Sequence, residues 1–284
     1  MELYTPKIEP KLPQTTLELL ELAKTHNFKE ICDIYDANPE ECICNFLARA
    51  YSDFYKDPNA LRLLKEYYDN KIITGDKILL LTDTHIGDSY AVPKLLDITY
   101  NHALKRNVKA AIHLGDIIEG DCGGIVNPDV ETQIKILKQY YPETEITTHY
   151  ITGNHDETFH GKNTNYYKMY KQIRDSIKGL EFFSSLRTFA NINGHRTMLY
   201  HCDAYSKHLP AFDYDIKLCG HSHCYNFDEN NRELTVPHLK SSNPSTAGFV
   251  MLYYDRDEYN IEQYGFDNNL NPIVKDVKTL KYKK

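Results

Sequence analysis

The segment 77–85, KILLLTDTH, constrains the fold more than any other stretch of the chain. Four apolar residues are followed at once by Asp83 and His85, a pattern typical of a buried parallel strand with polar side chains at its carboxyl end. Residues two apart on a strand point to the same face, so the Asp83 carboxylate and the His85 imidazole can converge just beyond the strand. An oxygen and a nitrogen ligand there could hold a cation. Taken alone, the same pattern also fits a helix cap beside a surface histidine.

Four later segments repeat this pattern. They are AAIHLGD, THYITGNHDE, RTMLYHCD and IKLCGHSH, and each brings a residue type that binds metals to the end of an apolar run: Asp116; Asn154 with His155; His201; and His221 with His223. Glycines stand directly before Asp116, Asn154 and His221, where they allow a sharp turn and keep side-chain bulk away from the neighbouring ligands. The five runs together are far more specific than any one of them.

Helical patterns alternate with these runs, near residues 92–107, 130–140 and 166–177. Such alternation predicts an α/β domain, which we place at residues 73–284. After the last run, the sequence LTVPHL predicts a strand, and GFVMLYYD with YNIEQYGF predicts an antiparallel hairpin across a short turn.

The N-terminal part has a different character. Residues 1–13 carry three prolines and predict an extended lead-in. Residues 14–72 show helical spacing, with a break at 37–39 that predicts a unit like a helix-turn-helix, Asn38 capping a helix that begins at Pro39. Residues 1–70 hold 8 Lys and Arg against 13 Asp and Glu, which disfavours DNA binding. We therefore predict a helical appendage that packs on the domain or docks a protein partner, with DNA as the weaker alternative.

Composition narrows the location and the partners. The formal net charge of −7 offers nucleic acid no overall attraction. The sequence has no run of 18 apolar residues and no signal-peptide pattern at its beginning, and its seven scattered cysteines are typical of reduced thiols. We expect a cytoplasmic protein without membrane association.

The motifs D-x-H, G-D-x-x-E, G-N-H-D, a lone H and G-H-x-H, in this order over about residues 77–265, resemble those of the calcineurin-like metallophosphoesterase superfamily. The resemblance implies an α/β/β/α sandwich of two facing mixed sheets, with a dinuclear metal site at the strand ends. It implies a first ion held by Asp83, His85, Asp116 and His223. It implies a second ion held by Asp116, Asn154, His201 and His221.

The resemblance also implies that His155 gives a proton to the leaving oxygen or binds phosphate as a cation, with Glu119 as its acidic partner. Mixed oxygen and nitrogen ligands suit Mn, with Fe, Zn or Ni as alternatives, better than Mg or Ca. Two such ions can activate a water and clamp a phosphoryl group for in-line displacement. The expected activity is metal-dependent phosphoester hydrolysis, and the substrate class includes nucleotides and nucleic acids.

Departures from the family's patterns narrow the class. Protein phosphatases of this superfamily carry an arginine where this chain has Gly120, and glutamate where it has Asp156. Cys202 follows His201, where the family usually has Gly or Pro. The departure at Cys202 concerns the geometry of that loop, whereas those at Gly120 and Asp156 favour the phosphodiesterase and nuclease-like branches. One alternative is a phosphomonoesterase or protein phosphatase with the same site, and another is a non-enzymatic DNA- or protein-binding regulator with structural metals.

Overall fold

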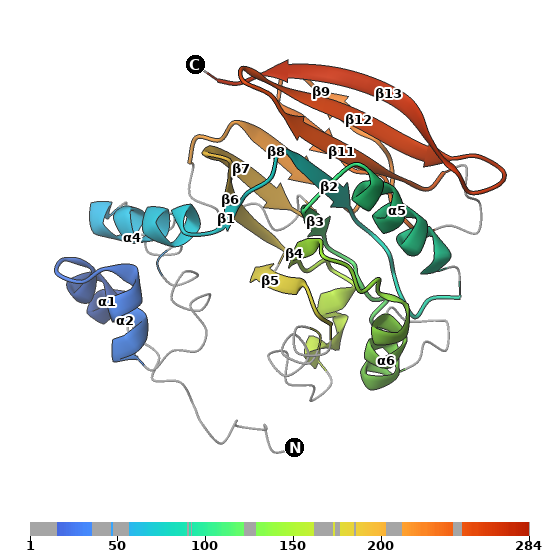
Figure 1. Cartoon of the computed structure of the whole chain (residues 1–284). Coiled ribbons are helices and arrows are strands. Elements are labelled where there is room, and N and C mark those ends of the chain that lie inside the picture. Colours follow the sequence, from blue (N-terminus) through green and yellow to red (C-terminus); the bar gives the residue numbers. More distant parts are fainter. Residues whose placement is uncertain are drawn as a thin grey trace.

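In the computed structural model, two mixed β-sheets pack face to face and helices cover their outer faces (Figure 1). The structure describes residues 16–35, 47, 57–89, 91, 93–121, 129–161, 173, 177–184, 186–202, 212–240 and 246–283. The helices are α1 (Thr16–Ala23), α2 (Phe28–Ile34), α4 (Pro58–Asp69), α5 (Pro93–Lys105), α6 (Val130–Tyr140) and a 3-10 helix (Asp156–Gly161).

The strands of the seven-stranded sheet are, in spatial order, β13 (Pro272–Lys281), β12 (Glu258–Phe266), β11 (Gly248–Tyr254), β2 (Lys77–Leu81), β3 (Ala110–Leu114), β4 (Thr147–Ile151) and β5 (Leu180–Ser184). The strands of the six-stranded sheet are β1 (Ile72–Ile73), β6 (Arg187–Ile192), β7 (His195–Tyr200), β8 (Ile216–Cys219), β10 (Glu233–Thr235) and β9 (Asn226–Asp228).

Strand β2 is buried on both faces. It pairs in parallel with β3, and β3 with β4, while β11 lies antiparallel on its other side. Leu79 and Leu81 face the core under α5 and α6, whereas Ile78 and Leu80 face the second sheet. A strand covered in this way needs apolar residues at every position, because successive side chains alternate between the two faces. The parallel strand predicted from KILLLTDTH is confirmed.

The core between the two sheets is built from alternate residues of both. Ala110 and Ile112 of β3 pack there with Leu199 of β7 and Leu218 of β8. On the other face of the seven-stranded sheet, the Tyr100 hydroxyl of α5 lies 2.6 Å from the hydroxyl oxygens of Tyr141 and Thr148. With both sheets mixed and helices outside, the predicted α/β/β/α sandwich is confirmed.

The outer helical layer of the six-stranded sheet comes from the N-terminal segment. Asp57 caps α4 by accepting hydrogen bonds from the main-chain N–H groups of Asn59 and Ala60, and Pro58 opens the helix. The buried face of α4 includes Tyr68, whose ring centroid lies 5.2 Å from that of Phe189 in β6. The predicted appendage therefore shares a core with the sandwich. Its limits at residues 14 and 72 stay a prediction.

Parts of the N-terminal prediction lie outside the described residues. These are the lead-in 1–13, the turn at 37–39 and the helix that begins at Pro39, so the helix-turn-helix geometry stays a prediction. The helix predicted near 166–177 also lies mostly outside them. Within the described part of the chain, no helix is long and apolar enough to cross a membrane.

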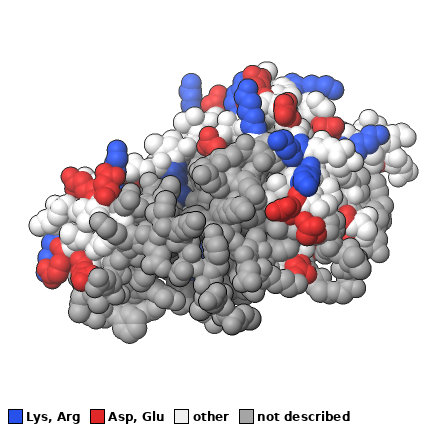
Figure 2. All heavy atoms as spheres, turned by 90° about the horizontal axis from the view of Figure 1, so that it is seen from below, with Lys and Arg blue, Asp and Glu red and all other residues white. Residues whose placement is uncertain are grey.

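Surface charges of both signs are mixed. Figure 2 shows both Lys or Arg and Asp or Glu side chains over the described part of one face.

Candidate metal centre

The loops after the parallel strands are tied together by main-chain hydrogen bonds. The N–H of Asp83, after β2, donates to the carbonyl of Gly115 after β3 at 3.0 Å. The N–H of His85 donates to the carbonyl of Asp116, also at 3.0 Å. Because the carboxyl ends of neighbouring parallel strands meet at one edge, these bonds bring the predicted ligand segments side by side.

Several predicted ligands have a left-handed backbone. Positive φ values occur at Asp83 (52°), His85 (44°), Asp116 (53°), His221 (68°) and His223 (60°). A residue other than glycine in this conformation costs about 1–3 kcal/mol and persists where the surroundings enforce it, often at functional sites. Five such residues in one cluster indicate that these loops are shaped for their side chains rather than for stability.

The predicted need for small residues beside the cluster is confirmed at two glycines. A Cβ on Gly153 would collide with the Asp116 carboxylate, and a Cβ on Gly115 would collide with the His201 ring. Gly115 also has a φ of 100°, which disfavours other residues.

A Gly153→Ala variant is expected to lose about 1–3 kcal/mol of unfolding free energy, because its new methyl group must displace Asp116. The same displacement should weaken Mn²⁺ binding. Gly194→Ala is the matched control, since Gly194 has a φ of 90° but open space around it. This control should lose a similar amount of unfolding free energy, about 1–2 kcal/mol, through backbone strain. It should bind Mn²⁺ normally. Urea unfolding and calorimetric titration measure both effects, and unchanged Mn²⁺ affinity in Gly153→Ala contradicts the prediction.

The first group of ligand-type side chains is Asp83, His85 and His223, whose ligand atoms all lie within 4.8 Å of one another. Asp83 Oδ1 lies 3.1 Å from His223 Nε2 and 3.6 Å from His85 Nε2. Its other oxygen, Oδ2, accepts hydrogen bonds from the Thr82 hydroxyl at 2.6 Å and the His221 N–H at 3.0 Å. The carboxylate is thus held by one oxygen while the other faces the two imidazoles.

The second group is Asp116, His201 and His221, again within 4.8 Å of one another. His201 Nδ1 lies 2.7 Å from the Leu114 carbonyl, so this nitrogen is the donor and Nε2 faces the cluster. Nε2 lies 3.0 Å from Asp116 Oδ2 and 3.1 Å from Asn154 Oδ1. Asp116 Oδ2 is also 3.7 Å from His85 Nε2, which joins the two groups.

The donor set fits divalent transition-metal ions. Asp83 Oδ1 and His85 Nε2 are buried and have no hydrogen-bond partner among the described residues, at a cost of about 1–3 kcal/mol for each atom. Burial by itself would lower the pKa of His85, but Asp83 and Glu119 raise it to about 9. The cluster therefore has a strongly negative potential, and a cation bonded to oxygen and nitrogen atoms would satisfy both unpaired groups.

His155 and Glu119 lie together beside this cluster. His155 Nδ1 lies 2.9 Å from the main-chain carbonyl of Glu119 and 3.6 Å from the carboxylate oxygen Oε2. The nearer partner of that carboxylate is His85, whose Nδ1 is 2.7 Å from Oε2. Glu119 thus contacts His155 mainly through its main-chain carbonyl and His85 through its side-chain carboxylate.

Asp156 ties two of the loops together. Its buried carboxylate accepts hydrogen bonds from the N–H groups of Ile118 at 3.0 Å and Gly153 at 2.8 Å. Burial, together with the nearby Asp116 carboxylate, raises the pKa of Asp156 to about 7. The sequence marks this residue only as a departure from a motif, whereas in the structure its carboxylate holds the loops after β3 and β4 together.

Two charged residues of the cluster were missed from the sequence. Lys240 follows β10, and its ammonium group contacts the carboxylates of Asp88 and Glu119. Neither Lys240 nor Asp88 belongs to a strand-end motif, so the pattern of apolar runs gives no signal for them.

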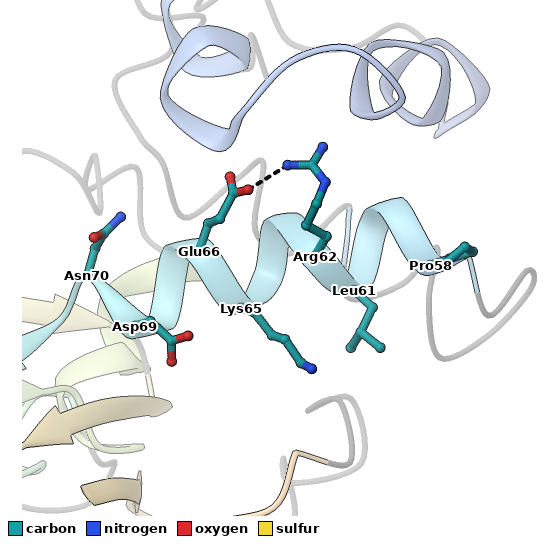
Figure 3. A pocket seen from close by; sticks show the side chains of 7 residues that line it. All are labelled: Pro58, Leu61, Arg62, Lys65, Glu66, Asp69 and Asn70. Carbon is teal, nitrogen blue, oxygen red and sulfur yellow. Dashed lines mark hydrogen bonds and ion pairs between the residues drawn. The ribbon is translucent and has the colours of Figure 1, made fainter. Parts of the chain in front are cut away.

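A groove lies elsewhere, along one face of α4, with a volume of about 520 Å³ (Figure 3). It is lined by Pro58, Leu61, Arg62, Lys65, Glu66, Asp69 and Asn70. Arg62 and Glu66 form an ion pair across 2.5 Å within it. None of the predicted ligands lines this groove, so it is separate from the candidate metal centre.

Comparison of the sequence with protein-family models identifies one family. A model of the calcineurin-like phosphoesterase superfamily domain matches residues 77–245. No curated protein matches the chain. Among solved structures, vacuolar protein sorting 29 from Cryptosporidium parvum is 14% identical and covers 73% of this chain and 98% of its own, with a TM-score of 0.45. A dimetal phosphatase from Danio rerio is 10% identical and covers 73% and 99%, with a TM-score of 0.42.

Proposed function

Since the chain belongs to the calcineurin-like phosphoesterase superfamily, we propose that it hydrolyses phosphoesters at a dinuclear metal site and prefers phosphodiesters. The observation that carries the proposal is the pair of ligand groups joined at Asp116. Both contain carboxylate oxygens and imidazole nitrogens, and two buried atoms of the first group, Asp83 Oδ1 and His85 Nε2, have no hydrogen-bond partner among the described residues. A protein that used metals only for stability would have no need of His155 beside the groups.

In this proposal, Asp83, His85, Asp116 and His223 hold one ion, and Asp116, Asn154, His201 and His221 hold the other. Mn²⁺ is the proposed metal, with Fe, Zn and Ni as alternatives. When bound, the two ions supply an activated water and offset the negative charge on phosphorus during in-line displacement. The chain's own contribution is to fix the ligand atoms: the Leu114 carbonyl orients His201, and Thr82 orients Asp83.

His155 is the proposed general acid. The Glu119 carbonyl holds the Nδ1 side of the ring, which leaves Nε2 as the nitrogen that can give a proton to the leaving oxygen. The ring is also held edge-on against His85, with centroids 4.5 Å apart. The side chain is 23% exposed, so it remains accessible to a substrate.

The preference for diesters rests on charge. A monoester dianion calls for more positive charge than a diester monoanion, and the arginine that protein phosphatases provide is missing at Gly120. Gly120 has a φ of 69°, and a Cβ there would collide with the His155 carbonyl, so no longer side chain fits without a local shift. Lys240 is already paired with two carboxylates. Cyclic nucleotides and the internucleotide linkages near nucleic-acid strand ends are diesters of the proposed class.

Hydrolysis of bis(p-nitrophenyl) phosphate and p-nitrophenyl phosphate by the Mn²⁺-loaded protein tests this preference. We expect kcat/KM to favour the diester by at least about tenfold, a difference of about 1.4 kcal/mol in transition-state stabilisation. The chelated protein is the control for metal-independent hydrolysis. A preference for the monoester would overturn the proposed preference for diesters. The proposal that the protein hydrolyses phosphoesters would still stand.

A further inference from the structure

We propose that Lys240 is a positioning residue for the metal centre, which acts on the ligand His85 through Glu119. The proposal rests on the function proposed above. The Lys240 ammonium group contacts Asp88 and lies 3.3 Å from Glu119 Oε2, and its side chain is only 18% exposed. Lys240 follows a strand of the six-stranded sheet, while its partners lie in the loops after β2 and β3 of the other sheet. Lys240 lies on the connection from β10 to β11, so its ion pairs tie this connection to the two loops beside the cluster.

The contact from Glu119 to His85 determines which imidazole nitrogen faces the cluster. The Glu119 carboxylate can only accept a hydrogen bond when ionised, so at 2.7 Å the His85 Nδ1 is the donor. In the neutral ring, which is the form that binds a cation, Nε2 is then the lone-pair nitrogen, and it faces Asp83 and Asp116 at 3.6 and 3.7 Å. A carboxylate that holds the far nitrogen of a metal-binding histidine fixes the ring and makes it a better ligand.

Lys240 completes this arrangement by holding the carboxylate itself. Asp83, Asp116, Glu119 and Asp88 bring four carboxylates into a small volume, and like charges this close repel one another. A partly buried ammonium group between Asp88 and Glu119 offsets that repulsion and keeps Glu119 against His85. Removal of its charge should let Glu119 move and leave His85 free to rotate.

The pairing also argues against a direct role for Lys240 on substrate. A phosphate oxygen would have to compete with two carboxylates for the ammonium group, both of which already contact it. The substrate-binding alternative predicts a higher KM with unchanged metal affinity, whereas the positioning role predicts weaker metal binding.

Calorimetric titration of the chelated protein with Mn²⁺ tests the proposal. We expect Lys240→Met to weaken one of two Mn²⁺ sites by about 10–100-fold, and Lys240→Arg to retain most of the affinity. Lys217→Met is the matched control, because Lys217 lies 3.3 Å from Glu233 in a comparable ion pair away from the predicted ligands. Wild-type affinity at both sites in Lys240→Met, with or without a raised KM, would overturn the inference.

Asp88→Asn provides a second variant that leaves Lys240 in place while removing one of its anchors. It should weaken the same site less than Lys240→Met, and two variants with unaltered Mn²⁺ affinity would contradict the positioning role even if one were poorly folded. Failure of the inference is distinguishable from failure of the proposed function. If the wild-type protein binds no Mn²⁺, the metal centre itself is wrong; if it binds two ions and the variants match it, only the role of Lys240 is wrong.

Discussion

An Asp116→Asn variant is expected to lose more than about 100-fold in metal-dependent hydrolysis, since even residues that only support a ligand cost 10–100-fold. It should also bind neither ion tightly. Asp116 is 1% exposed, belongs to the second ligand group and lies 3.7 Å from His85 of the first, so its charge acts on both proposed ions. The substituted amide keeps an oxygen that can accept the hydrogen bond from the His155 N–H, now 2.8 Å from Oδ1. The variant therefore tests the charge of this side chain more than the shape of the loop.

A comparison with Asp83→Asn tests whether Asp116 is the shared ligand, because Asp83 is proposed to bind only one of the two ions. Asp83 belongs to the group with His85 and His223, and not to the group with His201 and His221. We expect this variant to keep one Mn²⁺ and lose the other. Asp213→Asn is the control, because Asp213 is 86% exposed and paired with Lys283. Equal losses in Asp116→Asn and Asp83→Asn, measured by calorimetry, would contradict the shared position of Asp116.

A His155→Ala variant is expected to bind both ions normally and to lose about 10²–10⁴-fold in kcat on a substrate with a poor leaving group. The reason is that a general acid stabilises the departing oxygen only when that oxygen is basic. On an aryl diester, whose leaving group departs readily without a proton, the loss should be much smaller. The main-chain hydrogen bond from residue 155 to Asp116 does not depend on the side chain, so the ligand loop should hold its shape.

The test of His155 uses a control variant at another histidine and two substrates, one with an alkyl and one with an aryl leaving group. His195→Ala serves as the control, since His195 lies at the start of β7, 3.4 Å from Asp215 and stacked on Tyr282. An equal loss on the alkyl and aryl substrates, with Mn²⁺ still bound, would indicate a phosphate-binding role for His155 in place of proton transfer.

The strands of the sandwich could be predicted where they are buried, because buried strands have a recognisable apolar sequence. Strands β2 and β3 are covered on both faces and so appear as apolar runs in the sequence, and the helix predicted at 130–140 matches α6. Strand β13 was not predicted, because seven of its ten residues are exposed on an edge of the sheet and carry no alternation. Sequence periodicity reports burial, and an edge strand has little of it.

The ligand-type residues could be predicted for a related reason: each follows a buried strand, and parallel strands end at a common edge. The contacts between them could not. Whether the Glu119 carboxylate lies nearer to His85 or to His155 depends on loop geometry, and the structure puts it 2.7 Å from the former and 3.6 Å from the latter. Lys240 reaches Glu119 from the connection between β10 and β11, 121 residues away in the sequence, which no local spacing encodes. The packing of α4 on β6 through Tyr68 and Phe189 is likewise a long-range contact.

The most direct test of the central claim is a titration of chelated protein with Mn²⁺ while hydrolysis of an aryl phosphodiester is followed. We predict that hydrolysis is absent without metal and reaches its maximum at two equivalents of Mn²⁺ per chain. Two bound equivalents without hydrolysis of the diester or the matching monoester would contradict the account and indicate a protein that uses its metals for structure or for binding a partner.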